Sequence, residues 1–443
     1  MQSNIRNALI MGAAGRDFHN FNVCFRKRKD IRIIAFTAAQ IPDIEGRRYP
    51  PQLAGPLYPE GIPIHPESEM ERLVEKFKVH DVYFSYSDVS SRYVLRKVAE
   101  VMKAQGNFIL LGPGETMLKS KLPVISVCAV RTGCGKSQTT RRISDILKAE
   151  GYRTAIVRHP MPYGDLSEQR VQVFRTISDL KRYNCTIEEM EEYEPHLKKG
   201  MEVYAGVDYE EILREAEKSA QIIVWDGGNN DLPFFRPDLE IVVADPHRAG
   251  HEIEYYPGAV NFMRADVIVI NKIDTSDPGN TAVVRENIQK YNPRATVVDA
   301  ASPIIVEGGD AIRGKRVLVI EDGPTLTHGE MKYGAGVVAA RKFGAAELVD
   351  PHAYAVGTIE DTFRRYPDMG PILPAMGYGS GQIKDLQRTI ANTECDLVII
   401  ATPVDLGSII EIKRPSVRVS YELQELGTPT LRDILKEWLK KKE

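Results

Sequence analysis

The feature that most constrains the fold is an apolar run that leads into a glycine-rich turn and then into a helix. The run is Val124–Val130, whose small and apolar residues are typical of a buried parallel strand. It is followed directly by Arg131-Thr-Gly-Cys-Gly-Lys-Ser137. A strand, a glycine-rich loop and a helix in this order are the setting of a phosphate-binding loop. The chain is therefore predicted to contain a mostly parallel sheet with helices on its faces.

Each residue type in this loop has a role in holding a nucleotide phosphate. Gly133 and Gly135 let backbone N–H groups close on phosphate oxygens, and the helix N-terminus adds partial positive charge. Lys136 can reach the β- and γ-phosphates, and Ser137 can hold Mg²⁺. Val130 stands where the usual pattern has its first glycine. The nucleotide-binding residues predicted from the loop are Thr132, Gly133, Cys134, Gly135, Lys136, Ser137 and Gln138.

Three later motifs, each at the end of a predicted strand, support a nucleotide site. Asp226 follows Ile222–Trp225 and is placed to hold Mg²⁺ directly or through water. Asn271-Lys272-Ile273-Asp274 has the NKxD form, whose carboxylate accepts both N1–H and N2–H of guanine. Ser302 follows the next strand, in the place of a loop that contacts the guanine carbonyl. The order of these motifs predicts a Mg²⁺-dependent site for ATP or GTP.

Two further residues are predicted to act on the transferred phosphate. Arg131 lies five residues before Lys136, where a basic side chain can reach phosphate within one chain or across a dimer. The alternative is a surface arginine that steadies the loop. Asp165 is a candidate second Mg²⁺ carboxylate or base. The predicted catalytic residues are Lys136, Arg131, Asp165 and Asp226, and the predicted metal ligands are Ser137, Asp165 and Asp226.

Polar and basic side chains also follow other predicted strands, at the sheet edge where α/β proteins bind ligands. Their charge predicts a small anionic, phosphorylated substrate. Solvated turns, helix caps and interdomain packing are the alternatives, and a metal site is disfavoured by loose spacing. The candidate substrate contacts are Arg16, His19, Arg158, His159, His247, Arg248, Asp322 and His328.

Alternating strand and helix patterns divide the chain into three α/β units with mostly parallel sheets. They are a Rossmann-like βαβ domain at 1–121, a nucleotide-binding domain at 122–312 and a C-terminal α/β domain at 313–443. The last of these is expected to end in an amphipathic helix at Thr430–Lys440. The acidic run Glu188–Glu194 is expected to be the solvated face of a helix.

Composition and charge exclude several classes of protein. The 443 residues carry a formal net charge of −3, which argues against a nucleic-acid binder. No run approaches the roughly 20 apolar residues needed to cross a bilayer, and a signal-peptide pattern is absent at the start. A cytoplasmic protein without a membrane partner is therefore expected. The five cysteines are odd in number and widely spaced, so reduced thiols are expected, with a disulfide or metal site as the alternative.

Several segments together resemble a known family. They are Gly12-Ala-Ala-Gly-Arg-Asp-Phe-His-Asn-Phe-Asn22, Arg131-Thr-Gly-Cys-Gly-Lys-Ser-Gln-Thr-Thr140, Arg158-His-Pro-Met-Pro-Tyr-Gly-Asp-Leu166, Trp225-Asp-Gly-Gly-Asn-Asn-Asp231 and Glu321-Asp-Gly-Pro-Thr-Leu-Thr-His328. The chain resembles, along its whole length, predicted P-loop GTPases similar to cyclic 2,3-diphosphoglycerate synthetase. The resemblance implies ATP-driven closure of 2,3-diphosphoglycerate into its cyclic pyrophosphate, with release of nucleoside diphosphate and phosphate.

The central unit also resembles one class of P-loop proteins. Arg131 stands where the dimerising, signal-recognition-like and dethiobiotin-synthetase-like class carries a signature lysine. This resemblance implies the fold of that class and, by analogy, a homodimer.

Two other functions stay open at this point. One is a regulatory or metallochaperone-like GTPase, in which hydrolysis drives a conformational change. The other is a ligase that acts on a different acidic metabolite. The nucleotide also stays open, because the NKxD motif favours guanine whereas the synthetase reaction uses ATP.

Overall fold

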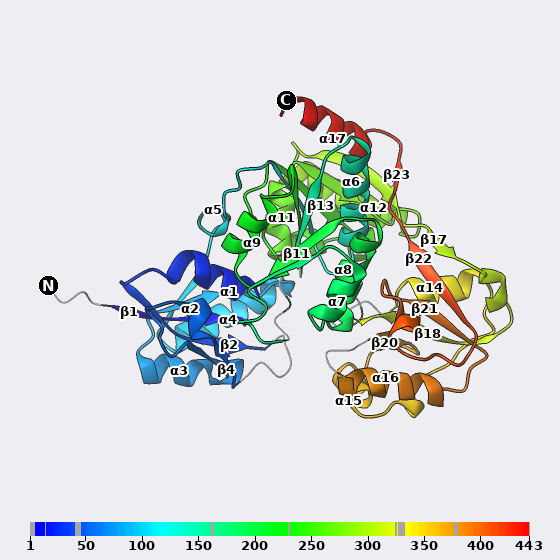
Figure 1. Cartoon of the computed structure of the whole chain (residues 1–443), viewed down its shortest axis with the longest axis horizontal. Helices are drawn as coiled ribbons and strands as arrows, with labels where there is room; N and C mark the ends of the chain where they lie inside the picture. Colours follow the sequence, from blue (N-terminus) through cyan, green and yellow to red (C-terminus); the bar gives the residue numbers. More distant parts are fainter. Residues whose placement is uncertain are drawn as a thin grey trace.

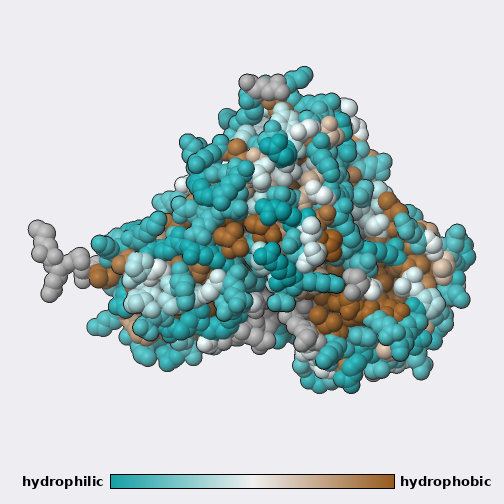
Figure 2. Space-filling model, in the orientation of Figure 1, coloured by the Kyte–Doolittle hydropathy of each residue, from teal (hydrophilic) through white to brown (hydrophobic). Residues whose placement is uncertain are grey.

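The computed structural model describes residues 5–13, 15–39, 46–159, 161, 164–228, 231–323, 326, 333–375 and 380–442. Three α/β units form the molecule, with the first and third on either side of the second (Figure 1). Figure 2 shows mostly hydrophilic outer surfaces, with hydrophobic residues on the side of the third unit that faces the middle of the molecule. None of the described helices is long and apolar enough to cross a membrane.

The first unit is a six-stranded sheet in the order β3-β4-β2-β1-β5-β7, parallel except for the pair β3–β4. Alternate residues of its central strand belong to two different cores, because helices cover both faces of the sheet. The strands are β1 (Arg6–Met11), β2 (Ile31–Ala38), β3 (Arg48–Tyr49), β4 (Ile62–Pro66), β5 (Asp81–Phe84) and β7 (Asn107–Leu110). The helices are α1 (Arg16–Asn20), α2 (Pro51–Ala54), α3 (Met70–Phe77), α4 (Ser91–Lys103) and α5 (Pro113–Thr116).

The second unit is a nine-stranded sheet in the order β10-β11-β9-β12-β8-β13-β15-β16-β23. Only its two edge strands, β10 and β23, run antiparallel to their neighbours. The strands are β8 (Val124–Ala129), β9 (Thr154–Arg158), β10 (Val171–Phe174), β11 (Glu202–Gly206), β12 (Ile222–Asp226), β13 (Leu239–Ala244), β15 (Val267–Ile270), β16 (Thr296–Ala301) and β23 (Gln424–Leu426). The helices are α6 (Lys136–Ala149), α7 (Ile177–Arg182), α8 (Ile187–Lys198), α9 (Tyr209–Ala216), α10 (His251–Glu254), α11 (Gly258–Arg264) and α12 (Pro278–Tyr291). A short antiparallel pair, β6 (Val89–Ser90) with β14 (Tyr255–Tyr256), joins this unit to the first.

The third unit is built around β18, whose alternate residues again enter two cores. Its sheet runs β17-β22-β21-β18-β19, and β20 also pairs with β18. The strands are β17 (Ile304–Val306), β18 (Arg316–Asp322), β19 (Glu347–Leu348), β20 (Leu373–Ala375), β21 (Leu397–Ala401) and β22 (Ser416–Tyr421), and the helices are α14 (Ala335–Lys342), α15 (Thr358–Arg365) and α16 (Ser380–Asn392). The predicted α/β class with mostly parallel sheets is therefore confirmed.

The last residues return to the central sheet instead of completing the third unit. Strand β23 pairs with β16, and α17 (Leu431–Lys440) buries its apolar stripe in the core of the second unit. Figure 1 shows this terminal helix above the central unit. Thr430 caps the helix by accepting the N–H of Asp433 at 3.2 Å. From the sequence, these last residues were assigned to the C-terminal domain at 313–443, whereas in the structure they pack on the second unit. The three domain boundaries stay a prediction.

The acidic segment of α8 was wrongly expected to be solvated. Glu188, Glu189, Glu191 and Glu194 are all buried. Helix α8 lies between two units, because Ile187 packs into the core of the third unit while Tyr193 packs into that of the second. Burial raises the pKa of Glu189 to about 7. A charge-rich helix is thus enclosed where the second and third units meet.

All five cysteines are unpaired in the structure, and reduced thiols stay a prediction. Burial raises the pKa of each thiol above its ordinary value. These side chains are therefore neutral at pH 7.

Candidate nucleotide and substrate site

The glycine-rich loop lies between buried strand β8 and helix α6, as its sequence predicts. Gly133 and Gly135 have φ angles of 81° and 106°, in the left-handed region that favours glycine. A Cβ atom at Gly135 would lie 2.1 Å from Asn271 Nδ2 and 2.4 Å from Gln138 Nε2. Glycine is therefore required here by both backbone conformation and space.

Lys136 and Asp226 meet beside this loop. The Lys136 ammonium donates to Asp226 Oδ1 at 2.7 Å, and Arg158 contacts the other carboxylate oxygen. Burial alone would raise the pKa of Asp226, but the charges of Arg158 and Lys136 outweigh it and hold that pKa well below the ordinary value. Asp226 is therefore an ionised carboxylate at the end of β12, next to the phosphate-binding lysine.

Helix α8 adds two residues that the sequence reasoning did not single out. Glu192 contacts Arg158 and accepts a hydrogen bond from Ser137 Oγ at 3.4 Å. His196 Nε2 lies 3.4 Å from Asp226 Oδ2. The two residues are four apart and so share one face of the helix. The four-residue spacing of Glu192 and His196 was the sequence signal for a shared helix face, but the other acidic residues around Glu192 obscured it.

The oxygen donors at this point fit Mg²⁺, which prefers carboxylate, hydroxyl and phosphate oxygens. Ser137, Asp226 and Glu192 supply them. Asp165 lies elsewhere: its carboxylate is exposed and accepts the N–H of Ser167 at 2.8 Å. None of its contacts within the described residues reaches Ser137 or Asp226. Among all the residues that the structure describes, no three or more His, Cys, Asp or Glu side chains form a cluster suited to a metal ion.

The NKxD segment packs against the phosphate-binding loop from the side. Asn271 Nδ2 donates to Cys134 O at 2.9 Å, and Lys272 Nζ donates to Gly133 O at 2.6 Å. The exposed Asp274 accepts the N–H of Ser302 at 3.2 Å. Ser302 in turn donates to Gln138 at 3.1 Å. The predicted base-reading residues from β15, β16 and α6 are thus brought together.

His247 and Arg248 contact residues of these loops, and their predicted role as substrate contacts stays a prediction. Arg248 Nη2 lies 3.2 Å from Asp245 Oδ2 and 3.4 Å from Cys134 Sγ. Asp245 also accepts from Lys272 at 3.0 Å. His247 Nε2 lies 3.0 Å from Thr275 Oγ1, and burial lowers the pKa of this imidazole.

Arg131 points toward the first unit. Its Nε donates to Asp88 Oδ1 at 2.6 Å, and its guanidinium lies 3.6 Å from the centre of the Tyr255 ring. Asp88 Oδ2 also accepts the N–H of Thr132 at 3.2 Å. These contacts fit the alternative interpretation of Arg131 as a residue that steadies the loop. The side chain is buried, however, and not at the surface as that alternative expected. Asp88 comes from a distant loop, and no local sequence signal marks it.

A second polar cluster lies between the first and second units. His159 Nε2 is 2.6 Å from Asp231 Oδ2. Arg16 donates to Thr116 Oγ1 at 2.8 Å and to Leu232 O at 3.1 Å. We call Lys136, Ser137, Gln138, Arg158, Glu192, Asp226 and Asn271 the nucleotide cluster. Because Arg158 and Asp226 pair in register on β9 and β12, His159 and Asp231 follow the same two strands as this cluster. We call Arg16, His19, Asn20, His159 and Asp231 the acceptor cluster.

His19 contributes a neutral ring to the acceptor cluster. It stacks on Phe234, with ring centroids 3.9 Å apart, and its Nε2 lies 2.6 Å from Thr116 O. Burial lowers the pKa of His19 to about 3, so the imidazole carries no charge at pH 7. The predicted residues Arg16, His19 and His159 are therefore brought together here, but with fewer charges than their sequence implies.

Two acceptor atoms in this cluster lack partners. Asp231 Oδ1 and Asn20 Oδ1 are buried and have no hydrogen bond within the part of the chain that the structure describes. Buried polar atoms are almost always hydrogen-bonded, so these two oxygens call for a ligand that donates N–H or O–H groups. A cavity of about 10 Å³ lies among Arg16, Asn20, Ser85, Asp231 and Tyr256. It has room for one water-sized molecule in this conformation.

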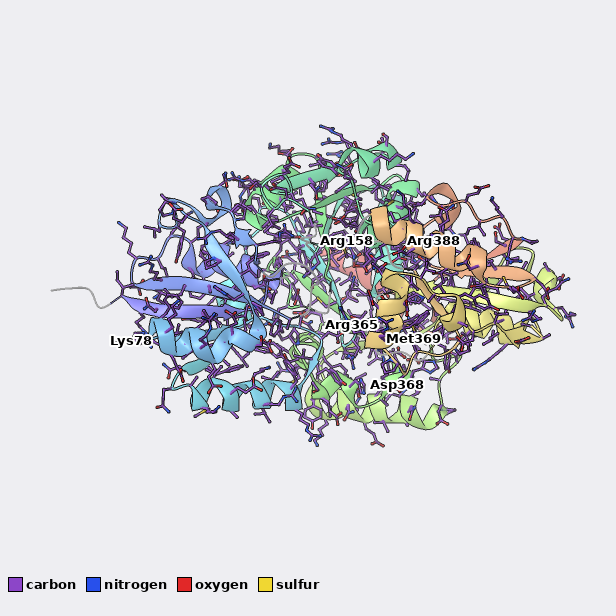
Figure 3. All side chains as sticks on the ribbon, turned by 90° about the horizontal axis from the view of Figure 1, so that it is seen from below. Lys78, Arg158, Arg365, Asp368, Met369 and Arg388 are labelled. Atoms are coloured by element: carbon purple, nitrogen blue, oxygen red, sulfur yellow. The ribbon has the colours of Figure 1, made fainter. Side chains whose placement is uncertain are left out.

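Asp322 of the third unit lies beside Glu191 of α8 where the second and third units meet. Burial and the neighbouring Asp322 carboxyl raise the pKa of Glu191, which also accepts a hydrogen bond from Thr402. Asp322 was predicted to contact an anionic substrate, but an acidic pair is poorly suited to that role. The other candidate in this unit, His328, lies outside the described residues. Figure 3 shows Arg158 near the middle of the molecule, between the first and third units.

Comparison with known proteins identifies the family. No family model matches the chain. The chain is 60% identical over 435 residues to arginine synthetase ArcE of Thermococcus kodakarensis. The aligned residues cover 98% of this chain and 97% of the relative. The chain belongs to the arginine synthetase family. The prediction of a P-loop synthetase is thereby confirmed at this level, whereas cyclisation of 2,3-diphosphoglycerate stays a hypothesis.

Solved structures resemble this member of the arginine synthetase family only distantly. LpxK of Aquifex aeolicus in complex with ATP is 12% identical with a TM-score of 0.42, covering 84% of this chain and 99% of that chain. The hydrogenase maturation factor HypB of Archaeoglobus fulgidus is 14% identical with a TM-score of 0.28, covering 41% of this chain and 81% of that chain. Similarities this distant say nothing about activity.

Proposed function

We propose that this protein makes arginine by forming a C–N bond at the ureido carbon of citrulline, driven by a nucleoside triphosphate. The observation that carries the proposal is the identity of 60% with an arginine synthetase over almost the whole of both chains. The phosphate-binding loop with Lys136, Ser137 and Asp226 supports phosphoryl transfer as the source of energy.

The reaction balances in two steps. The γ-phosphoryl group first passes to the ureido oxygen, which releases nucleoside diphosphate and makes that oxygen a leaving group. Ammonia then attacks the carbon, its C–N bond forms as the C–O bond breaks, and inorganic phosphate departs. A proton lost from the attacking nitrogen leaves the product guanidinium. Thiol-dependent release of nitrogen from an amide donor is not supported, because all five thiols have raised pKa values.

The nucleotide cluster would hold and neutralise the phosphates. Lys136 is placed for the β- and γ-phosphates, and Arg158 sits beside the carboxylate at the end of β12. Ser137, Asp226 and Glu192 are the oxygens that would hold Mg²⁺, which supplies charge neutralisation when bound. Asp274 and Ser302 would contact the base, and both ATP and GTP remain candidates.

By its charges the acceptor cluster suits an amino acid better than a highly charged phosphate ester, and its cavity of about 10 Å³ must widen to admit either. It offers one arginine, the neutral His19, and the acidic Asp231. The free acceptor atoms of Asn20 and Asp231 suit the N–H groups of a ureido compound or of ammonia. A substrate with several negative charges would require more uncompensated cations than this cluster supplies. Cyclisation of 2,3-diphosphoglycerate is therefore the second candidate.

One experiment tests both candidates. Purified protein is given Mg²⁺, ATP or GTP, and either citrulline with ¹⁵N-ammonium or 2,3-diphosphoglycerate. We expect arginine with one ¹⁵N atom in the guanidinium group, formed in equal amount with nucleoside diphosphate. Nucleotide consumption with no labelled arginine would overturn the proposal. A new pair of pyrophosphate resonances in the phosphorus spectrum of the other tube would favour the cyclase.

A further inference from the structure

A second pocket lies at the opposite edge of the central sheet from the phosphate-binding loop. It has a volume of about 560 Å³, within the range of small-molecule sites. Glu240 at the start of β13 and Asp266 just before β15 line it, while Asp245 just after the other end of β13 contacts the nucleotide loops. The residues that line this rear pocket are Pro113, Gly114, Met117, Lys119, Arg236, Pro237, Glu240, Arg264 and Asp266.

The rear pocket is lined by positively and negatively charged side chains, some of which lack an ion-pair or hydrogen-bond partner among the described residues. Lys119 and Arg236 are exposed and take part in no ion pair with any residue the structure describes. Glu240 is only 3% exposed; one of its oxygens pairs with Arg264 at 3.0 Å, whereas Oε1 is buried with no hydrogen-bond partner among the described residues. Asp266 accepts the backbone N–H of Glu240 at 2.8 Å.

Such a lining selects a ligand with two opposite charges. A carboxylate group suits Lys119 and Arg236, which can offer charge-assisted hydrogen bonds. A guanidinium or ammonium group suits Glu240 and Asp266 in the same lining. Burial raises the pKa of Glu240 to about 7, and a cation bound next to it would keep this carboxyl ionised.

We propose that the rear pocket is a second binding site for a basic, zwitterionic amino acid of the arginine type. The inference rests on the proposed function in one respect, because it takes the product of the reaction as the ligand. It adds a site remote from the phosphate-binding loop, through which the product acts on the enzyme.

Helix α5 connects the rear pocket to the acceptor cluster. Pro113, Gly114 and Met117 line the pocket, while Thr116 between them accepts hydrogen bonds from Arg16 and lies against His19 on the other side. The backbone of Leu118 also pairs with the segment after Asp231, through Phe234 O at 2.8 Å. A ligand in the rear pocket would therefore shift the groups that hold the substrate, and arginine would inhibit with a noncompetitive component.

Binding is measured by calorimetry on the full chain without nucleotide, with L-arginine, agmatine and inorganic phosphate as separate probes. The test variant is Lys119→Ala with Arg236→Ala, and the matched control is Lys121→Ala, an exposed lysine outside the pocket. We expect the test variant to lose one class of arginine site, with affinity falling at least about tenfold, while the control binds as the wild type does. Agmatine, which lacks the carboxylate, should bind the wild type more weakly than arginine.

Two results would overturn the inference. One is an identical arginine isotherm for the wild type and the double variant, including no binding to either. The other is phosphate binding as tightly as arginine, which would make the pocket a simple anion site.

The proposed function is judged separately, by arginine formation without added product. If that activity is absent while the double variant loses an arginine site, the proposed function fails and the rear pocket stands. If activity is normal in both proteins and the noncompetitive inhibition persists in the variant, the rear pocket fails and the function stands.

Discussion

The nucleotide cluster and the acceptor cluster lie at the same edge of one sheet, yet they are satisfied in different ways. In the nucleotide cluster, Lys136 pairs with Asp226, and Asn271 donates to the loop backbone. In the acceptor cluster, oxygens of Asn20 and Asp231 have no partner among the described residues. The nucleotide cluster also has buried atoms without a partner among the described residues, and two of them, Gln138 Nε2 and Arg158 Nε, are hydrogen-bond donors. Under the proposed function, unpartnered donors suit phosphate oxygens, whereas unpartnered acceptors suit the N–H groups of a polar substrate.

The largest expected effect comes from the nucleotide cluster. Lys136→Ala removes the cation that faces the transferred phosphate, and we expect the turnover number for arginine formation to fall about a thousandfold. Steady-state kinetics with citrulline, ammonia and ATP or GTP measure it. Lys148→Ala, on the exposed side of the same helix, should change little. If Lys136→Ala kept most of its activity, the loop would not be the site of phosphoryl transfer.

The next effect should distinguish the two clusters. Asp231→Asn keeps the shape of the side chain but removes its charge and one acceptor, so the KM for citrulline should rise about ten- to a hundredfold. The KM for nucleotide should stay within about twofold, since Asp231 is not part of the nucleotide cluster. Asp361→Asn, an exposed change in the third unit, serves as the control. Equal increases in both KM values would contradict the division into two clusters.

A pH effect on stability should come from the acceptor cluster through His19. Its pKa is lowered to about 3 in the folded chain, against 6.5 for the free side chain, so the unfolded state binds more protons between these values. This contribution to stability is present above about pH 6.5 and is lost as the pH falls. Denaturant unfolding should show His19→Gln losing about 2 kcal/mol less than the wild type between pH 7 and pH 5. The same loss in both proteins would contradict the buried neutral ring, and His80→Gln, at an exposed histidine, is the control.

The smallest expected effect concerns Asp88, which joins the first unit to the glycine-rich loop. Asp88→Asn weakens the ion pair with Arg131 but keeps an acceptor for the Thr132 N–H. The KM for nucleotide should rise about fivefold, which corresponds to about 1 kcal/mol. Asp30→Asn, at an exposed pair with Arg28 in the same unit, should have no effect. A change in the KM for citrulline alone would place the influence of Asp88 in the acceptor cluster instead.

The sequence predicted those parts of the fold and site that are local. The predicted runs Val124–Val130 and Ile222–Trp225 form strands that end within one residue of the expected bounds, because an unbroken apolar run between turns has few other structures open to it. The loop and NKxD segment were found because their residues are contiguous. Strand β11 was missed, because Glu202–Gly206 is short and contains a polar residue and a glycine.

The parts that escaped prediction depend on contacts between distant segments. Glu192 reaches Ser137 and Arg158 only because α8 is enclosed between two units, and nothing within the acidic run indicates that enclosure. Asp88 and Asp231 gain their roles from partners on other elements. The sequence did place Arg16 and His159 among the candidates, but it did not reveal that a carboxylate would lie between them.

The pairing of β16 with β23 has a consequence for how the molecule is put together. Ala301 and Gln424 lie directly opposite each other, and Ile304 and Tyr421 are paired in the next strands. The chain thus leaves and re-enters the central sheet through adjacent strands, and the whole third unit is an insertion with both of its connections at one edge of that sheet. Helix α8 holds the same unit at a second place, because Ile187 packs into its core and Glu191 accepts a hydrogen bond from Thr402. The third unit is therefore fastened to the central unit twice, by its paired strand connections and by the helix that reaches its core.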